Sequence, residues 1–235
     1  MSTDAARRFY KEASVREDGG GFSIMLDARE LKTPGQRPFR IGKRALADAI
    51  AAEWQAQDKQ IIPATMPMTR FATVSIDHTR DARDERIGIV AKYAETDLIC
   101  HRADTPAALA VRQKSLWDPL LAWAEKDLNL FLPVVTGVIA ADISPAQFAA
   151  VRWAADGLDD FALTALTHTA GLAGSCVIAF ALQRGRLDAD GAFQAACLDD
   201  LWSQEKWGAD AEAIARLDRI HAEFEEVARF FQMLK

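Results

Sequence analysis

Carboxylates and tryptophans are the side chains best placed in this chain to take part in recognition or chemistry, and several of them are neighbours in the sequence. The positions that stand out are Glu53, Trp54, Asp97, Trp117, Asp118, Asp199, Asp200 and Trp207. Asp200, Ser203 and Trp207 follow a spacing of i, i+3 and i+7, which places them on one face of a helix. Such a face suits protein recognition, because tryptophan supplies contact area and aspartate orients a basic group of a partner. The alternative is that Trp207 anchors the end of its helix in the core.

Motifs for catalysis and metal binding are weak in the sequence. The four histidines are dispersed, and the neighbours in Asp77-His78 and Cys100-His101 would point in different directions on a helix. No G-x-S-x-G is present, so a hydrolase is poorly supported. We therefore expect no metal, no cofactor and no enzymatic activity. An enzyme that uses carboxylates in a cleft is the alternative, and a carboxylate with a raised pKa in a concave apolar pocket would favour it.

Composition narrows the choice of partner. The 235 residues are 50% hydrophobic and carry a net charge of −6, with a pI near 5.3, which argues against nucleic acid or an anionic membrane. Residues 188–235 hold eleven acidic and five basic side chains, so this end could meet a basic surface. The longest apolar run, residues 170–182, falls short of the roughly 20 residues that span a bilayer. We expect a cytoplasmic protein that is a monomer when free, with its three cysteines reduced in the core.

Hydrophobic periodicity predicts an α+β fold with two lobes. Phe22, Ile24 and Leu26 alternate with Ser23, Met25 and Asp27, which is the period of a half-buried strand, and glycines at 19–21 predict a hairpin turn beside them. Helical spacing begins at Lys43 and continues almost to the end of the chain; in the first helix, Leu46, Ile50 and Trp54 fall on one face. We therefore expect a small antiparallel β-rich N-terminal lobe in residues 1–42, followed by a larger helical bundle lobe in residues 43–235.

Several boundaries within the helical part can be predicted. Thr105-Pro106, Asp118-Pro119 and Ser144-Pro145 each combine a capping side chain with a following proline, which is typical of a helix start. Residues 133–139 could form one isolated strand. Residues 158–184 are apolar on most sides and predict one buried helix. In the final helix, His221 occupies a position in the apolar repeat.

Six segments, taken in order and spacing, resemble a known family. They are LDARELKTP (26–34), LADAIAAEWQAQ (46–57), MPMTRFATVSID (66–77), ETDLICHRAD (95–104), QKSLWDPLLAW (113–123) and LDDLWSQEKWG (198–208). The chain is similar, from about Phe9 to Phe231, to the assembly chaperones of the ATP synthase catalytic head that bind its alpha subunit. This family is best known from mitochondria and has relatives in alphaproteobacteria.

The resemblance implies an ATP-independent chaperone that holds the free alpha subunit until the beta subunit arrives. Carried over by motif, the matching positions are Glu53-Trp54, Thr96-Asp97, Trp117-Asp118-Pro119 and Asp199-Asp200 before Trp207. The chain departs from the family, which favours Glu at 199 and 200 and Gln at 203. The shorter carboxylates keep the charge and lose about one methylene of reach. A subunit that stays in a permanent complex is a further alternative, and co-purification with finished ATP synthase would distinguish it.

Overall fold

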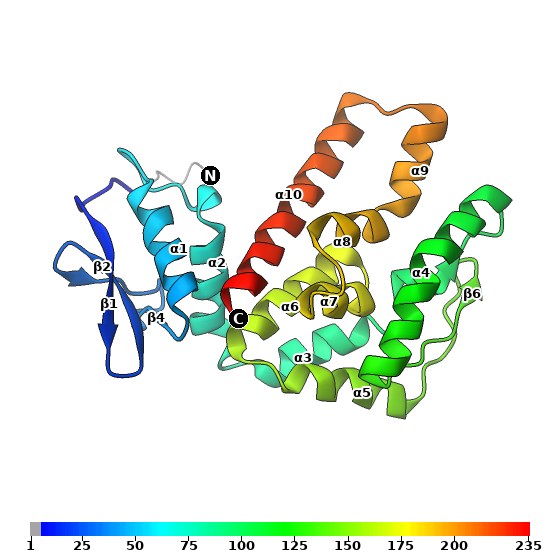
Figure 1. The fold of residues 1–235 in the computed structure, drawn as a ribbon, viewed down its shortest axis with the longest axis horizontal. Coiled ribbons are helices and arrows are strands. Elements are labelled where there is room, and N and C mark those ends of the chain that lie inside the picture. Colours follow the sequence, from blue (N-terminus) through cyan, green and yellow to red (C-terminus); the bar gives the residue numbers. More distant parts are fainter. Residues whose placement is uncertain (1–5) are drawn as a thin grey trace. The chain divides into compact units, whose positions relative to one another are not determined.

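The computed structural model describes residues 6–235, and its chain divides into two compact units. Unit 1 comprises the chain up to Ala82 together with residues 229–235, and unit 2 comprises residues 83–228. This division differs from the predicted boundary at residue 42. The reason is that helix α1 (Arg44–Gln55) packs against the strands before it, so the β-rich segment and the first helices share one core. The α+β fold class is confirmed (Figure 1).

Unit 1 is built on an antiparallel sheet. Strands β1 (Ala13–Asp18) and β2 (Gly21–Leu26) form a hairpin, and β3 (Arg29–Glu30) and β4 (Arg40–Ile41) also pair with β2. The hairpin turn is made by Gly19 and Gly20, whose positive φ angles of 25° and 137° favour residues without a Cβ atom. This confirms the turn that the glycine run predicts.

Apolar side chains of α1 cover the sheet. Of the predicted apolar face, Leu46 and Ile50 lie one turn apart and are fully buried, whereas Trp54, one turn further on, is half-buried. After α1, the chain forms the 3₁₀ turn η1 (Pro63–Thr65), α2 (Pro67–Val74) and the π-helical turn η2 (Ser75–Thr79).

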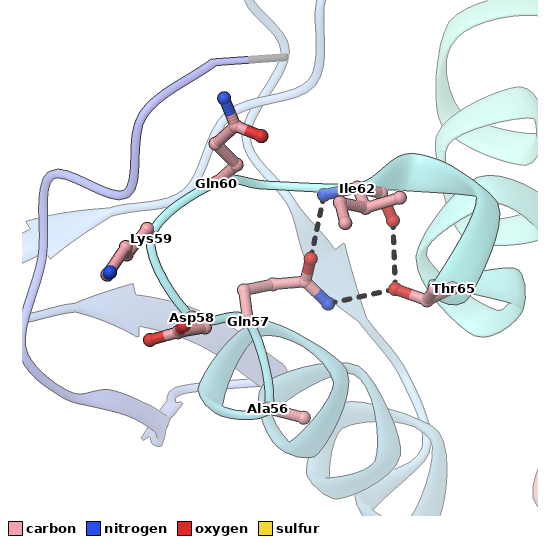
Figure 2. Close-up of a pocket in the computed structure, with 7 residues that line it drawn as sticks. All are labelled: Ala56, Gln57, Asp58, Lys59, Gln60, Ile62 and Thr65. Carbon is pink, nitrogen blue, oxygen red and sulfur yellow. Dashed lines mark hydrogen bonds between the residues drawn. The ribbon is translucent and has the colours of Figure 1, made fainter.

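The residues between α1 and η1 enclose a hollow of about 460 Å³ (Figure 2). There Gln57 accepts a hydrogen bond from the Ile62 amide at 2.7 Å and donates one to Thr65 Oγ1 at 3.1 Å, so its side chain holds the turn.

Unit 2 consists mainly of helices (Figure 1). Its elements are α3 (Arg83–Lys92), η3 (Leu98–Cys100), β5 (His101–Arg102), α4 (Ala107–Leu128), β6 (Val135–Thr136), α5 (Pro145–Asp156), α6 (Asp160–Ala173), α7 (Cys176–Gln183), α8 (Ala189–Ala196), α9 (Leu198–Trp207) and most of α10 (Ala211–Met233). Helix α7 is buried along almost its whole length and packs against α4, α6 and α8. The core of unit 2 therefore surrounds α7. Cys100, Cys176 and Cys197 are free and buried, as expected.

Three predicted boundaries are wrong. Pro119 lies inside α4, because buried side chains before and after it keep the helix packed through the proline. The predicted helix over 158–184 is two helices, α6 and α7, separated where Gly174 adopts a φ of 63° and Ser175 caps the next helix by accepting from the Ile178 amide. The strand expected in residues 133–139 is only β6, and it pairs in parallel with β5. The Ser144-Pro145 start is confirmed, since Ser144 caps α5.

His221 is half-buried rather than part of the core. Its ring lies 4.7 Å from that of Phe193, and its Nε2 is 2.6 Å from Asp190 Oδ1. It therefore links α10 to α8 at the surface. No helix among residues 6–235 combines the length and the apolar character needed to cross a membrane.

Candidate partner-binding surface

The acidic pair lies in the first turn of α9, and its two members have different partners. Asp199 is exposed, and its Oδ1 accepts a hydrogen bond of 2.8 Å from Nε2 of Gln113 on α4. Asp200 is half-buried and forms an ion pair of 2.6 Å with Arg216 on α10. Because Gln113 is neutral, the negative charge of Asp199 stays available to a basic group. The charge of Asp200 is already compensated.

Trp207 is the last residue of α9 and is 73% exposed. Its ring packs edge-to-face with that of Trp202, with centroids 5.2 Å apart and an interplanar angle of 81°. Trp202 is buried and anchors the helix in the core. Gly208 ends the helix with a φ of 80°. The alternative in which Trp207 serves as the core anchor is therefore wrong. An exposed tryptophan at a helix end is the kind of side chain that contributes much of the binding energy in protein interfaces.

Helices α4 and α9 enclose an apolar groove of about 450 Å³, which we call the α4–α9 groove. Its lining residues come from α4, α8 and α9 and are Ala108, Val111, Arg112, Ser115, Leu116, Gln194, Leu198 and Leu201. Val111 is 68% exposed, although it is β-branched and apolar. Leu116 and Leu201 are half-buried and Leu198 is buried. Accessible apolar area in a groove is typical of a surface that binds another protein.

An ion pair joins the two helices beside this groove. Arg112 Nη1 on α4 donates to Glu205 Oε2 on α9 at 2.6 Å, and the side chains are 42% and 54% exposed. The hydrogen bond from Arg112 lowers the pKa of Glu205 below its ordinary value. Pairs this exposed contribute little to stability, so this one can open at low cost when a partner arrives.

Trp117 is buried and does not belong to this surface. It is 1% exposed, and its Nε1 donates to the Ala195 carbonyl of α8 at 2.9 Å. The guanidinium of Arg102 lies over the indole ring, 5.2 Å from its centroid, and also pairs with Asp118 at 2.9 Å. A direct contact of Trp117 with a partner is not possible in this conformation. Trp117 and Asp118 instead hold α4 against β5 and α8.

Asp97 is also buried, at 1% exposure, and its carboxylate serves neighbouring backbone groups. It accepts from the Ile99 amide at 3.3 Å and from the Val177 amide at the start of α7 at 3.2 Å. Burial raises the pKa of Asp97, as the enzyme alternative requires. The space beside it is only about 10 Å³, which is room for roughly one water molecule. Asp97 therefore has no room for a substrate and stabilises the start of α7.

Glu53 and Trp54 belong to unit 1. The Glu53 carboxylate accepts from the Met68 amide at 2.7 Å and from the Thr69 amide at 2.8 Å, which caps the start of α2. Burial raises the pKa of Glu53, against the lowering effect of these bonds. Trp54 is half-buried, with its ring 5.7 Å from that of Tyr10. Both residues organise unit 1. The Glu53 carboxylate accepts hydrogen bonds from three donors, the third being the Thr69 hydroxyl.

The predicted residues thus divide by accessibility. Asp199, Asp200 and Trp207 lie together on α9, whereas Asp97 and Trp117 are enclosed. Val111, Leu116 and Leu201 line the groove but are not among the residues that the sequence predicts. Their signal was slight, because isolated apolar residues on a long helix are as expected of a core face as of a binding face. Within residues 6–235, no group of three or more His, Cys, Asp or Glu side chains is placed to hold a metal ion.

Comparisons with known proteins find chaperones of similar sequence and the same fold. The model of the ATP12 chaperone protein family matches residues 7–125. The crystal structure of Atp12 from Paracoccus denitrificans superposes with a TM-score of 0.93 and is 37% identical, covering 98% of this chain and 99% of that one. The Atu1473 protein of Agrobacterium tumefaciens has a TM-score of 0.91 and 34% identity, covering 97% of this chain and 86% of that one.

A relative from a eukaryote is more distant. The mitochondrial protein atp12 of Schizosaccharomyces pombe is 24% identical over 219 residues, which cover 88% of this chain and 75% of that protein. The fold is thus that of an assembly chaperone. This chain belongs to the ATP12 chaperone family.

Proposed function

We propose that this protein binds the unassembled alpha subunit of ATP synthase, prevents its aggregation and releases it when the beta subunit arrives. Membership of the ATP12 chaperone family is the observation that carries the proposal. An unassembled subunit exposes apolar surface that is buried in the finished complex, and a holder must cover this surface while binding less tightly than the true partner.

The surface of α4 and α9 supports this role. The α4–α9 groove offers apolar contact area, Trp207 offers an exposed aromatic ring, and Asp199 offers a charge that forms no ion pair within residues 6–235. We propose that Asp199 and Trp207 contact the alpha subunit directly and that Asp200 acts at the edge of the same interface. In this scheme Glu53, Trp54, Asp97, Trp117 and Asp118 support binding by positioning the elements described above.

The holding activity needs no nucleotide and no catalysis in this proposal. Light scattering of isolated alpha subunit diluted from denaturant tests it. We expect an equimolar amount of this protein to suppress scattering without ATP. If scattering is unchanged until ATP is added, the passive-holder mechanism is wrong. Purified ATP synthase from the host should lack this protein, and its presence there would favour a permanent subunit instead.

A further inference from the structure

The segment between α4 and α5 carries exposed apolar side chains that the α4–α9 groove does not use. Phe131 and Val134 are exposed, and Val138 and Ile139 reach 94% and 83% exposure. Isolated apolar residues at a surface are normal, but four within nine positions form a cluster that needs a physical reason.

Beside this cluster lies the open edge of a sheet. Strand β6 has β5 as its one paired neighbour in the described chain. The Gly137 amide donates to the Arg102 carbonyl at 2.9 Å, so Gly137 faces β5. Successive residues of a strand direct their N–H and C=O groups to opposite edges, so those of Thr136 face away from β5. Thr136 is exposed, and its outward groups can pair with another strand.

Among the features that commonly protect a sheet edge against strand pairing, this edge has a short strand, since β6 is only two residues long, but it has no basic residue. Proteins commonly place lysine on exposed edges, yet no basic residue occurs between Lys126 and Arg152. The neighbouring charge is instead the carboxylate of Asp142, which is exposed and has no ion pair within residues 6–235. Unit 2 as a whole carries 23 acidic and 13 basic side chains. Its charge therefore complements a basic partner.

We propose that the open edge of β6, with Val134, Val138 and Ile139, is a second docking surface that binds an extended, apolar segment flanked by basic residues. The segment adds to the sheet as a third strand through Thr136, and its basic residues face Asp142. Assigning this strand to the alpha subunit rests on the proposed function. The chemistry of the site does not depend on that assignment.

A synthetic peptide of alternating valine and threonine with lysine at both ends is a direct probe. Calorimetry measures its affinity for the full chain, and NMR follows amide exchange at Thr136. The control peptide has the same side chains with alternate backbone amides N-methylated, which blocks strand pairing. We expect the unmodified peptide to bind and to slow exchange at Thr136, and the control to do neither. Equal binding of both peptides would overturn strand addition.

Two variants at one position separate the backbone from the side chain. Thr136→Pro removes the outward N–H and should weaken peptide binding about tenfold, whereas Thr136→Ala keeps the N–H and should bind normally. Equal affinity of the two variants would contradict the proposal. Melting temperatures show whether Thr136→Pro folds, and the exchange measurement on the unmodified chain gives an answer if it does not.

The test of the β6 docking surface and the test of the proposed holding function can fail independently. If the chain suppresses scattering of alpha subunit but ignores the peptide, the strand site is wrong and the holding function stands. If the chain binds the peptide through Thr136 but leaves scattering unchanged, the strand site stands and the client is different. Sedimentation of the free chain tests the remaining occupant, since a dimer abolished by Thr136→Pro would show that a second copy covers this edge.

Discussion

Charge reversal at the acidic pair of α9 should separate binding from folding. Although Asp199 and Asp200 are adjacent, only Asp200 is paired with a cation, Arg216. We therefore expect Asp199→Lys to weaken binding of the alpha subunit more than Asp200→Lys does. The double variant should show the largest loss.

The expected changes in the free energies of unfolding and binding follow from the contacts of the two aspartates. Asp200→Lys loses an exposed ion pair and adds repulsion from Arg216, each worth about 0.2–1 kcal/mol in the free energy of unfolding. Asp199→Lys loses the hydrogen bond from Gln113, worth about 1 kcal/mol. Both variants should therefore fold. For binding, loss of one attraction and gain of one repulsion at an exposed position should weaken affinity by about 1–2 kcal/mol, or roughly tenfold.

Titration calorimetry with alpha subunit at two salt concentrations measures binding, and circular dichroism melting measures stability. The loss of affinity for Asp199→Lys should shrink as salt rises, because ions screen exposed charges. The matched control is Glu85→Lys, which makes the same charge change at an exposed position on α3. A control that loses affinity equally would indicate net charge rather than a site. A fall in melting temperature proportional to the loss of binding would show that the pair is structural, and the assignment to the interface would be withdrawn.

Three further predictions test the supporting contacts. Trp54→Arg places a charge where half of an indole is buried, and we expect a loss of about 2–4 kcal/mol in unfolding free energy by chemical denaturation. An unchanged stability with lost partner binding would show instead that Trp54 contacts the partner. Trp117→Ala should cost about 3–5 kcal/mol and leave little soluble protein, and normal expression with an unchanged melting curve would contradict its positioning role. The Asp27 carboxylate accepts hydrogen bonds from the Glu12 and Lys11 amides, and these bonds lower its pKa below the ordinary value of 3.8. Its contribution to stability is therefore present above pH 3.8 and is lost as the pH falls through the lower pKa of the folded state. Amide shifts of both residues should titrate in that range by NMR and lose this step in Asp27→Asn.

The sequence by itself determined the type and order of most elements. A period of two and a glycine turn were enough to locate the hairpin, because side chains alternate along a strand and its turn needs positive φ angles. The expected half-buried strand was wrong, since Ser23 and Met25 are buried as Ile24 and Leu26 are. Likewise, the spacing of Leu46 and Ile50 identified the buried face of α1. Six ordered segments also identified the family, since these patterns are properties of the chain alone.

Only the tertiary structure decided accessibility. Trp117 and Trp207 have the same side chain and follow similar helical patterns, yet one donates to a carbonyl in the core and the other is exposed. Asp199 and Asp200 are chemically identical, and distant residues on α4 and α10 determine which keeps a free charge. Pro119 likewise remained helical because surrounding contacts outweigh a local break. Burial and pairing depend on residues that are distant in the chain, and the local spacing of side chains does not reveal which distant residues come into contact.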